Sequence, residues 1–393
     1  MNIAIVGCGY VATMYAKTLP HHGCLRLVGA HDSDPARIDS FVARWPSRRY
    51  ATLDELLGDP SVETVLNLTN PRAHFEITRR CLERGKHVYS EKPLAMTAAD
   101  AEVLVRMAAA QRLHLCSAPC SVLSETAQTL WHAIRSSAIG RVRLVYANFD
   151  DGMIAPSQAP WNWRDERGVS WPAKDEFEVG CTYEHAGYLL TWLCAYFGPA
   201  RRVTAFASCQ LPDKGIAVDA MAPDFTVGSI EFDAGVVARI TCSLVAPRDK
   251  SLTVVGDAGV AFVTDVRNDR APVFVRPSNG NRIEAAVQRR LRPITRWLEQ
   301  RVPAAVIDRL AAKRYRPVKS AKPAAVAADK PVDFLLGVSE LAEAIAAGRA
   351  PYLSPQLGAH IVEIIEALQH PERFGFRKTL TTTFPLMSPR SSC

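Results

Sequence analysis

The segment YSEKPLAMT, residues 89–97, places Glu91 and Lys92 directly before Pro93, after a short run typical of a buried strand. The proline ring biases the backbone of Lys92 towards extended conformations and removes the next amide donor. An ammonium group fixed in this way at a strand end could stand in a binding cleft. The alternative is a surface turn in which Glu91 and Lys92 form a solvated ion pair. The choice between them depends on the elements that surround the segment.

The first residues of the chain form a second pattern suited to ligand binding. MNIAIVGCGYVA contains a short apolar strand and then Gly-x-Gly-x-x-Ala over residues 7–12, after which the apolar residues take helical spacing. In such a turn the first glycine permits a tight bend, the second lets backbone approach a pyrophosphate, and the small third residue allows helix-on-strand packing. Amides at the helix start can then bind phosphate oxygens. We therefore expect a dinucleotide to contact Gly7, Gly9, Tyr10, Val11 and Ala12.

The second predicted strand, LRLVGAHD, ends at Asp32, twenty residues after Ala12. A carboxylate at this spacing can accept both hydroxyls of the adenosine ribose and would repel a 2′-phosphate, so NAD is favoured over NADP. Arg37 is the nearby residue that could reverse this preference. Asp32 could also cap the helix that begins near Asp34-Pro35, and this role is compatible with ribose binding.

Strand and helix patterns alternate through the first 120 residues. After the first two strands, strands are expected at 62–69, 87–91 and 113–119, and helices at 52–59, 70–85 and 97–112. This alternation predicts a doubly wound parallel sheet whose ligand lies beyond the carboxyl ends of the strands. Thr69, Asn70, Glu91 and Lys92 all follow such ends. The sequence therefore favours a cleft position for Lys92.

The motifs IVGCGYVA, LNLTNPRAH and SEKPLAMTAADAE, with the helix at 184–198, resemble those of the Gfo/Idh/MocA oxidoreductases. The resemblance implies an N-terminal NAD(P)-binding Rossmann domain at 1–120. It also implies a C-terminal α/β domain at 121–393 with an open, mostly antiparallel sheet. It further implies that Lys92 contacts the nicotinamide ribose and the substrate hydroxyl, and that Thr69, Asn70 and His74 lie along the cofactor. For His74 the alternative is a helix residue that faces solvent or caps locally.

Members of this family usually carry Asp-x-Gly-x-His, with the histidine as acid/base. Here the matching residues are Glu184, Ala186 and Tyr188, and tyrosine is an attested alternative in the family. Glu184 and Tyr188 are four residues apart and so share one helix face. An unperturbed tyrosine has a pKa near ~10, so Lys92 would have to stabilise the phenolate. His185 is the other candidate proton carrier, and Lys92 acting alone is a third.

Each of these residues also has a structural explanation: Tyr188 could be a core aromatic beneath the sheet and His185 a helix histidine whose hydrogen bonds are satisfied within the fold.

The loop at 159–172 is rich in tryptophan and arginine. Its residues Trp163 and Arg164 are candidates for substrate binding, with packing across the domain junction as the alternative. Strands expected at 201–211, 224–244 and 250–265 would form the second sheet, whose outer face forms subunit contacts in relatives. We therefore expect a homo-oligomer.

Composition limits the partners. The net charge of +7 is concentrated in residues 281–330, where thirteen Lys/Arg face four Asp/Glu. The rest of the chain is slightly acidic, which gives no case for nucleic-acid binding. Residues 281–330 read as a basic helical insertion, and contact with a membrane surface is a less favoured interpretation than a solvated face.

The ten cysteines are scattered without metal-ligand spacing, so we expect reduced thiols, no metal and a cytoplasmic protein. Taken together, the sequence predicts an NAD(P)-dependent oxidoreductase. It would transfer hydride between nicotinamide and a secondary alcohol or ketone of a sugar, cyclitol or nucleotide sugar. An NAD-dependent glycosidase that oxidises its substrate transiently and a non-catalytic dinucleotide sensor are the alternatives.

Overall fold

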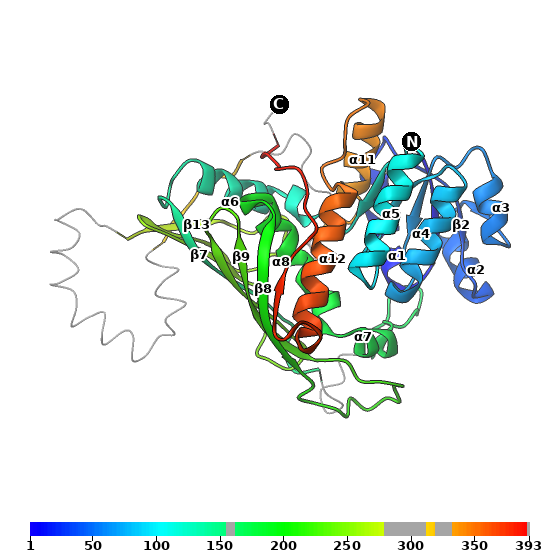
Figure 1. Ribbon diagram of the computed structural model, residues 1–393. Helices are drawn as coiled ribbons and strands as arrows, with labels where there is room; N and C mark the ends of the chain where they lie inside the picture. Colours follow the sequence, from blue (N-terminus) through cyan, green and yellow to red (C-terminus); the bar gives the residue numbers. More distant parts are fainter. Residues whose placement is uncertain (155–161, 279–311, 319–331, 391–393) are drawn as a thin grey trace.

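The computed structural model describes residues 1–154, 162–278, 312–318 and 332–390 (Figure 1). Its N-terminal part is built on a six-stranded sheet with the order β3-β2-β1-β4-β5-β6, in which every neighbouring pair is parallel. The strands are β1 (Asn2–Val6), β2 (Arg26–His31), β3 (Arg48–Arg49), β4 (Thr64–Asn67), β5 (His87–Ser90) and β6 (Leu115–Ser117). The order changes direction between β1 and β4, which is where a doubly wound sheet opens a ligand crevice.

The helices of this part begin where the sequence supplies capping side chains. Asp34, Thr52 and Thr97 each accept hydrogen bonds from first-turn amides of α2, α3 and α5. The helices and turns are α1 (Tyr10–Thr18), η1 (Leu19–His21), α2 (Pro35–Arg44), α3 (Leu53–Gly58), η2 (Pro71–Ala73), α4 (His74–Glu83) and α5 (Ala98–Ala110). No side chain caps α1, so its first-turn amides are available to a ligand.

The second part contains a nine-stranded sheet with the order β14-β13-β12-β11-β7-β10-β9-β8-β15. Among the described strands of this second sheet, only the β7–β10 pair is parallel, and the other neighbours are antiparallel. The strands are β7 (Val142–Asp150), β8 (Ala200–Ser208), β9 (Phe225–Phe232), β10 (Val237–Ser243), β11 (Leu252–Gly256), β12 (Gly259–Val263), β13 (Phe274–Pro277), β14 (Lys313–Arg314) and β15 (Arg377–Thr379). This confirms the predicted fold, an α/β Rossmann domain joined to a mostly antiparallel sheet.

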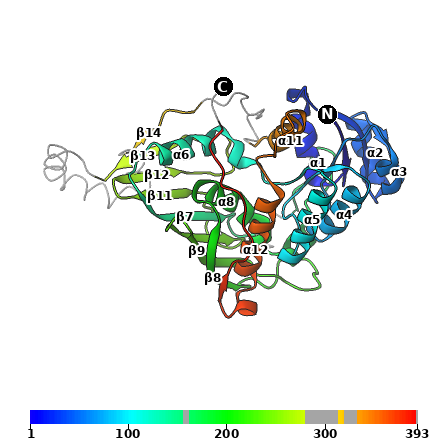
Figure 2. The same cartoon turned by 45° about the horizontal axis from the view of Figure 1, so that its top comes forward.

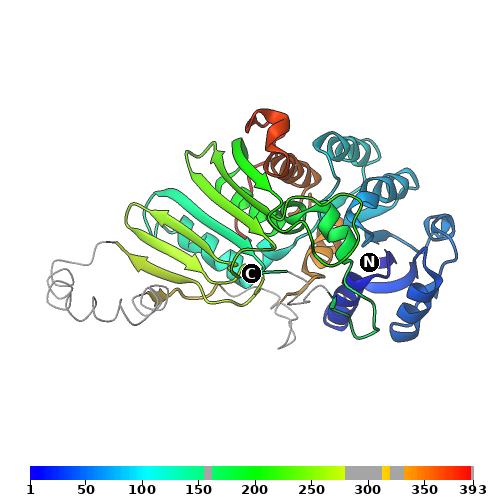
Figure 3. The ribbon, with the colours of Figure 1, turned by 90° about the horizontal axis from the view of Figure 1, so that it is seen from below.

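The helices and turns of this part are η3 (Ser121–Leu123), α6 (Glu125–Arg135), α7 (Ala173–Val179), α8 (Cys181–Phe197), α11 (Leu336–Ala346), α12 (Pro355–Gln369) and η5 (Pro371–Phe374). Helices α6, α8 and α12 pack against the strands of the larger sheet. Every residue of α8 is buried, and the helix ends at Gly198, whose φ of +80° is favourable only for glycine. Figure 3 shows the larger sheet on one side of the molecule and the N-terminal domain on the other.

Helix α12 joins the two parts by contacting helices and strands that lie far before it in the chain. It packs against α5 of the N-terminal domain and against α8 and β8 of the second (Figure 2). The amide of Ala98, at the start of α5, donates to Glu366 on α12 at 3.1 Å. The C-terminal segment therefore fixes the position of one domain on the other.

Most of the expected basic insertion, 281–330, lies outside the described residues, and so do its helical pieces and its proposed membrane contact. Within 312–318, Lys313–Arg314 form the edge strand β14, and the amide of Tyr315 donates to Val273 O. No helix among the described residues is long and apolar enough to cross a bilayer. The nine cysteines of the described ranges are free thiols, and no metal-binding cluster of His, Cys, Asp or Glu was found there.

Candidate active site

The glycine-rich turn after β1 has the geometry that a pyrophosphate requires. Gly7 has a φ of +94°, and a Cβ at this position would lie 2.6 Å from the carbonyl oxygen of Leu68. A Cβ on Gly9 would meet no atom within 4 Å, so the space above this residue is open. With the uncapped amides of α1 beside it, the turn fits the phosphates of a dinucleotide.

Asp32 lies at the carboxyl end of β2, beside the glycine-rich turn. Its side chain accepts hydrogen bonds from the amide of Cys8 at 2.6 Å and from the amide of Asp34 at 2.8 Å. The expectation that Asp32 caps the next helix is wrong: Asp34 is the N-cap, and it also pairs with Arg37 at 3.3 Å. Asp32 is thus free of the capping role and stands where the family motif places a ribose-binding carboxylate.

The turn after β4 connects the N-terminal domain with α7. The Thr69 hydroxyl donates to the side chain of Asn67 at 2.7 Å, and the side-chain Nδ2 of Asn70 donates to the Asp175 carboxylate on α7 at 2.7 Å. His74 is fully buried, and its ring nitrogens lie 2.9 Å from Thr69 O and 2.6 Å from Pro93 O. Burial lowers the pKa of His74, against the effect of these two carbonyl groups. Its ring therefore connects the two turns, and the alternative of a histidine that faces solvent is wrong.

The solvated-pair interpretation of Glu91 and Lys92 is wrong. Glu91 is buried, and its carboxylate accepts hydrogen bonds from the hydroxyl of Tyr15 at 2.7 Å and from the amide of Lys92 at 3.0 Å. Lys92, whose peptide bond to Pro93 is cis, extends to the second domain and pairs with Glu184 on α8. Its side chain is 16% exposed. The structure thus puts the Lys92 ammonium at the junction of the two domains.

Three ionisable side chains meet at this junction. Burial disfavours the charged form of Lys92, but the carboxylate of Glu184 outweighs burial and holds the lysine pKa above its ordinary value. Burial also opposes ionisation of Glu184, yet Lys92 and a hydrogen bond from Glu176 lower the pKa of this carboxyl group. Burial and the neighbouring Glu184 raise the pKa of Glu176. Glu176 therefore keeps a proton that it shares with Glu184, while Lys92 stays charged.

Tyr188 lies one turn after Glu184, as the sequence predicts. Its ring stacks on Phe149, with the centroids 5.1 Å apart, and the guanidinium carbon of Arg267 lies 4.9 Å from the ring centroid. Burial raises the pKa of Tyr188, whereas the positive charges of Arg267 and Lys92 lower it in part. The phenol therefore retains its proton near neutral pH and can donate it.

His185 belongs to a second buried group, and its ring also lies against Phe149. Its Nε2 lies 2.9 Å from Asp151, and Asp151 also pairs with Lys250. The Nδ1 atom of His185 is buried without a hydrogen-bond partner. Burial opposes ionisation of Asp151, but His185 and Lys250 outweigh it and hold the pKa of Asp151 below its ordinary value. This is a histidine oriented by a carboxylate, the arrangement of a general base.

The loop that carries Trp163 and Arg164 lies against the N-terminal domain. Trp163 is exposed and packs beside Trp171, and Arg164 donates to Gly168 O within the loop. Among the described residues, neither side chain forms a hydrogen bond, ion pair or ring contact with Lys92 or Tyr188. The buried members of the loop are Asp165 and Arg167, and Arg167 donates to the carbonyl oxygens of Cys8 at 3.0 Å and Gly9 at 2.8 Å.

Comparison with known proteins agrees with this geometry. A family model described as "Oxidoreductase family, NAD-binding Rossmann fold" matches residues 1–118, and the "GFO/IDH/MocA C-terminal domain" matches residues 127–262. The chain belongs to the Gfo/Idh/MocA family. Its N-terminal domain is therefore an NAD-binding Rossmann domain, as the glycine-rich turn predicts.

Similar Gfo/Idh/MocA proteins include trans-1,2-dihydrobenzene-1,2-diol dehydrogenase of Sus scrofa, 25% identical over 56% of this chain and 59% of that protein. Another is scyllo-inositol 2-dehydrogenase (NADP(+)) of Bacillus subtilis, 25% identical over 40% of this chain and 41% of that protein. The chain thus spans little more than half the length of the first curated relatives it matches.

Two solved structures share the fold along almost the whole chain. Aldose-aldose oxidoreductase from Caulobacter crescentus, complexed with glycerol, gives a TM-score of 0.73 at 20% identity and covers 97% of this chain and 99% of its own. The WlbA dehydrogenase from Bordetella pertussis, in complex with NADH and UDP-GlcNAcA, gives 0.68 at 17% identity and covers 98% of each chain.

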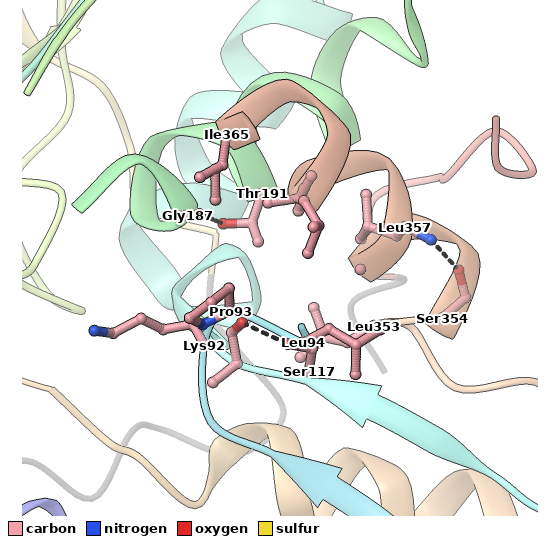
Figure 4. Close-up of a pocket in the computed structure, with 14 residues that line it drawn as sticks. Lys92, Pro93, Leu94, Ser117, Gly187, Thr191, Leu353, Ser354, Leu357 and Ile365 are labelled. Atoms are coloured by element: carbon pink, nitrogen blue, oxygen red, sulfur yellow. Dashed lines mark hydrogen bonds between the residues drawn. The ribbon is translucent and has the colours of Figure 1, made fainter. Parts of the chain in front are cut away.

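A small cavity lies behind the Gfo/Idh/MocA Glu-Lys-Pro segment, under α8 and α12 (Figure 4). Its lining is mainly apolar and includes Pro93, Leu94, Leu357 and Ile365. Lys92 contributes to the rim, but its side chain points away from the cavity (Figure 4). Thr191 donates to Gly187 O at 3.0 Å on the cavity side of α8. This cavity is therefore separate from the charged site.

Sequence reasoning missed Glu176, Asp151, Lys250 and Arg267, which the structure adds to the site. The sequence could have indicated Glu176, because this residue lies in an acidic helical segment four residues before Gly180. The others come from the end of β7 and from turns after β10 and β12, where no local motif marks them.

Proposed function

We propose that this chain is an NAD(P)-dependent oxidoreductase acting on a secondary alcohol or ketone of a sugar, cyclitol or nucleotide sugar, with NAD as the favoured cofactor. The observation that carries the proposal is the Lys92–Glu184 pair, which brings a charged ammonium of the dinucleotide-binding domain onto the helix of the second domain that bears Tyr188. The dehydrogenase activities named for relatives support the chemical class. Asp32 at the end of β2 supports NAD.

Each residue has a defined task in this mechanism. The glycine-rich turn and Asp32 would hold the dinucleotide, whose nicotinamide would supply the hydride chemistry. Lys92, kept charged by Glu184, donates hydrogen bonds to the reacting oxygen and stabilises negative charge that develops on it. Tyr188 gives its phenolic proton to that oxygen during ketone reduction. In alcohol oxidation the same transfer runs in reverse, so the phenolate form of Tyr188, which the positive charges of Arg267 and Lys92 favour, takes the proton.

The proton carrier can be identified by two separate substitutions. We expect Tyr188→Phe to lower kcat by about a hundredfold or more, because one acid–base group typically contributes about 10²–10⁴. His185→Ala should lower it by less than about tenfold, since His185 would then act only by packing beside Phe149. The measurement is steady-state NADH formation across pH. Near-normal turnover in the Phe variant with loss in the Ala variant would transfer the role to His185 and Asp151.

The function itself is tested by incubating the wild-type protein with NAD⁺ and a panel of aldoses, cyclitols, uronates and nucleotide sugars. We expect net NADH from at least one member. Tight NADH binding without turnover of any member would favour a dinucleotide sensor instead. Cleavage of a glycoside without net NADH would favour the glycosidase alternative.

We also propose a homo-oligomer formed through the outer face of the larger sheet. Leu144, Tyr146 and Phe206 are large apolar side chains exposed on its strands, at 42%, 43% and 51%. Large apolar side chains exposed on the face of a sheet commonly mark a protein interface. We expect Tyr146→Glu to shift the sedimentation coefficient to that of a monomer. A wild-type protein that already sediments as a monomer would contradict the proposal.

A further inference from the structure

Arg267 is a cation of the site that the mechanism above leaves unused. Its guanidinium carbon lies 4.9 Å from the ring centroid of Tyr188, and the side chain is half-buried. Among the described residues, no carboxylate lies within ion-pair distance of Arg267; Asp151, Asp265 and Glu91 act on it only through longer-range attraction. A half-buried guanidinium without a paired anion is costly, and stacking on an aromatic ring offsets only part of that cost.

The other cations around the site are neutralised by carboxylates. Lys92 pairs with Glu184 and Lys250 pairs with Asp151. These contacts are made within the chain, so neither ammonium requires a ligand to compensate its charge. Arg267 differs from both, and its planar fork of N–H donors suits bidentate binding of a carboxylate or phosphate.

The turn that carries Arg267 is held in place before any ligand binds. The amide of Arg267 donates to the side chain of Asp265 at 2.8 Å, and the amide of Val266 donates to Lys250 O at 2.9 Å. Two residues further on, the backbone oxygen of Asp269 accepts from Thr126 on α6, and its carboxylate accepts from the amide of Asp333 at 2.7 Å. These hydrogen bonds fix the backbone that carries the guanidinium, so less ordering is needed when a ligand binds.

We propose that the substrate carries an anionic group, a carboxylate or a phosphate, and that Arg267 binds this group. The inference rests on the proposed function, because it places the anion on the same small molecule that Lys92 and Tyr188 act on. Since the guanidinium lies over the ring of Tyr188, the anionic group and the reacting hydroxyl belong to neighbouring parts of that molecule. Sugar acids and sugar phosphates satisfy this requirement, and neutral sugars do not.

The pyrophosphate of the cofactor is the other candidate anion for Arg267, because Arg267 also interacts electrostatically with Tyr10 at the glycine-rich turn. The test therefore compares ligands and cofactor separately. Wild type, Arg267→Gln and Arg267→Lys are assayed for NADH formation with glucuronate, glucose 1-phosphate and UDP-glucose against glucose. NADH affinity is measured for each variant by fluorescence titration. Arg239→Gln is the matched control, because Arg239 stacks on Tyr146 on the exposed face of the sheet.

We expect wild type to prefer at least one anionic sugar over glucose, and Arg267→Gln to lower kcat/KM for it by about 10- to 100-fold, the usual effect of losing a charge-assisted pair. Turnover of glucose and NADH affinity should change less than about threefold, Arg267→Lys should recover part of the loss, and Arg239→Gln should behave as wild type. Equal losses on neutral and anionic sugars would overturn the proposal. So would a weakened NADH affinity that accounts for the whole effect, which would assign Arg267 to the pyrophosphate.

If none of these sugars is turned over, the proposed function fails on this panel, and the inference is decided by binding alone. Calorimetric titration of the enzyme–NADH complex with the same four compounds then gives the answer. Binding of an anionic sugar that Arg267→Gln abolishes and Arg239→Gln leaves intact supports an anion site. Absence of any preference for the anionic sugars over glucose overturns it.

Discussion

Replacing Lys92 by methionine is expected to lower kcat/KM by at least about a thousandfold while NADH still binds. Methionine keeps most of the side-chain volume but removes the donor that stabilises charge on the reacting oxygen, and loss of one such donor typically costs about 10²–10³ in kcat. The loss should exceed this range because Glu184 is left buried beside Glu176 without its cation. Steady-state kinetics and NADH fluorescence titration measure the two effects separately.

Lys86 supplies the matched control. It is also buried, and its ammonium donates to the carbonyl oxygens of Asp59 and Val62 at 2.7 and 2.9 Å, away from the domain junction. Lys86→Met should therefore lower the melting temperature but leave kcat/KM of the folded fraction within about threefold of wild type. Comparable losses of activity in the two variants would mean that Lys92 acts by supporting the fold. Turnover by Lys92→Met near the wild-type rate would remove the basis of the proposed function.

The residues that sequence reasoning placed correctly are those whose position follows from local pattern. Gly7, Gly9, Asp32 and Lys92 each follow a short apolar strand, and parallel strands bring their carboxyl ends to one edge of the sheet. Glu184 and Tyr188 share a face because four residues complete about one helical turn. In these cases the spacing of the residues along the chain determines which of them lie close together in the fold.

Other features of the site depend on contacts between residues far apart in the chain, which the sequence pattern does not indicate. His74 occupies a helix start, and only the fold reveals that Thr69 and Pro93 lie at its two ring nitrogens. Whether Asp32 or Asp34 caps α2 depends on which carboxylate faces the first-turn amides, and both are compatible with the sequence. Arg267 enters the site from a turn of the second sheet, so its partner ring is far away along the chain.

A contact of the same non-local kind joins the loop at 162–171 to the glycine-rich turn. This contact predicts a second strong effect. Arg167 and Asp165 form an ion pair whose side chains are 4% and 0% exposed. Arg167 also donates to Cys8 O and Gly9 O, and Thr13 donates to Asp165. The second domain thus holds the backbone that a pyrophosphate must approach, so the loop should affect cofactor affinity although it lies outside the motif.

We expect Arg167→Leu to weaken NADH binding by about ten- to a hundredfold and to lower the melting temperature. Breaking a buried pair leaves Asp165 uncompensated, at a cost of about 3–5 kcal/mol in comparable cases. Asp165→Asn/Arg167→Gln, which removes both charges, should recover much of the stability but not the NADH affinity, because the donors to Cys8 O and Gly9 O are still altered. Fluorescence titration and thermal melts separate the two quantities.

The same loop provides the control for this experiment. Glu166 pairs with Lys17 and Arg44 at the surface, with distances of 2.5 and 3.6 Å, and such exposed pairs contribute little. Glu166→Gln should therefore leave both NADH affinity and melting temperature within error of wild type. An Arg167→Leu variant that binds NADH within twofold of wild type would show that the loop only packs on the turn. Loss of NADH affinity in Arg167→Leu but not in Glu166→Gln would instead mean that the second domain holds the cofactor site in shape. Docking of the two domains and binding of the cofactor would then be thermodynamically coupled.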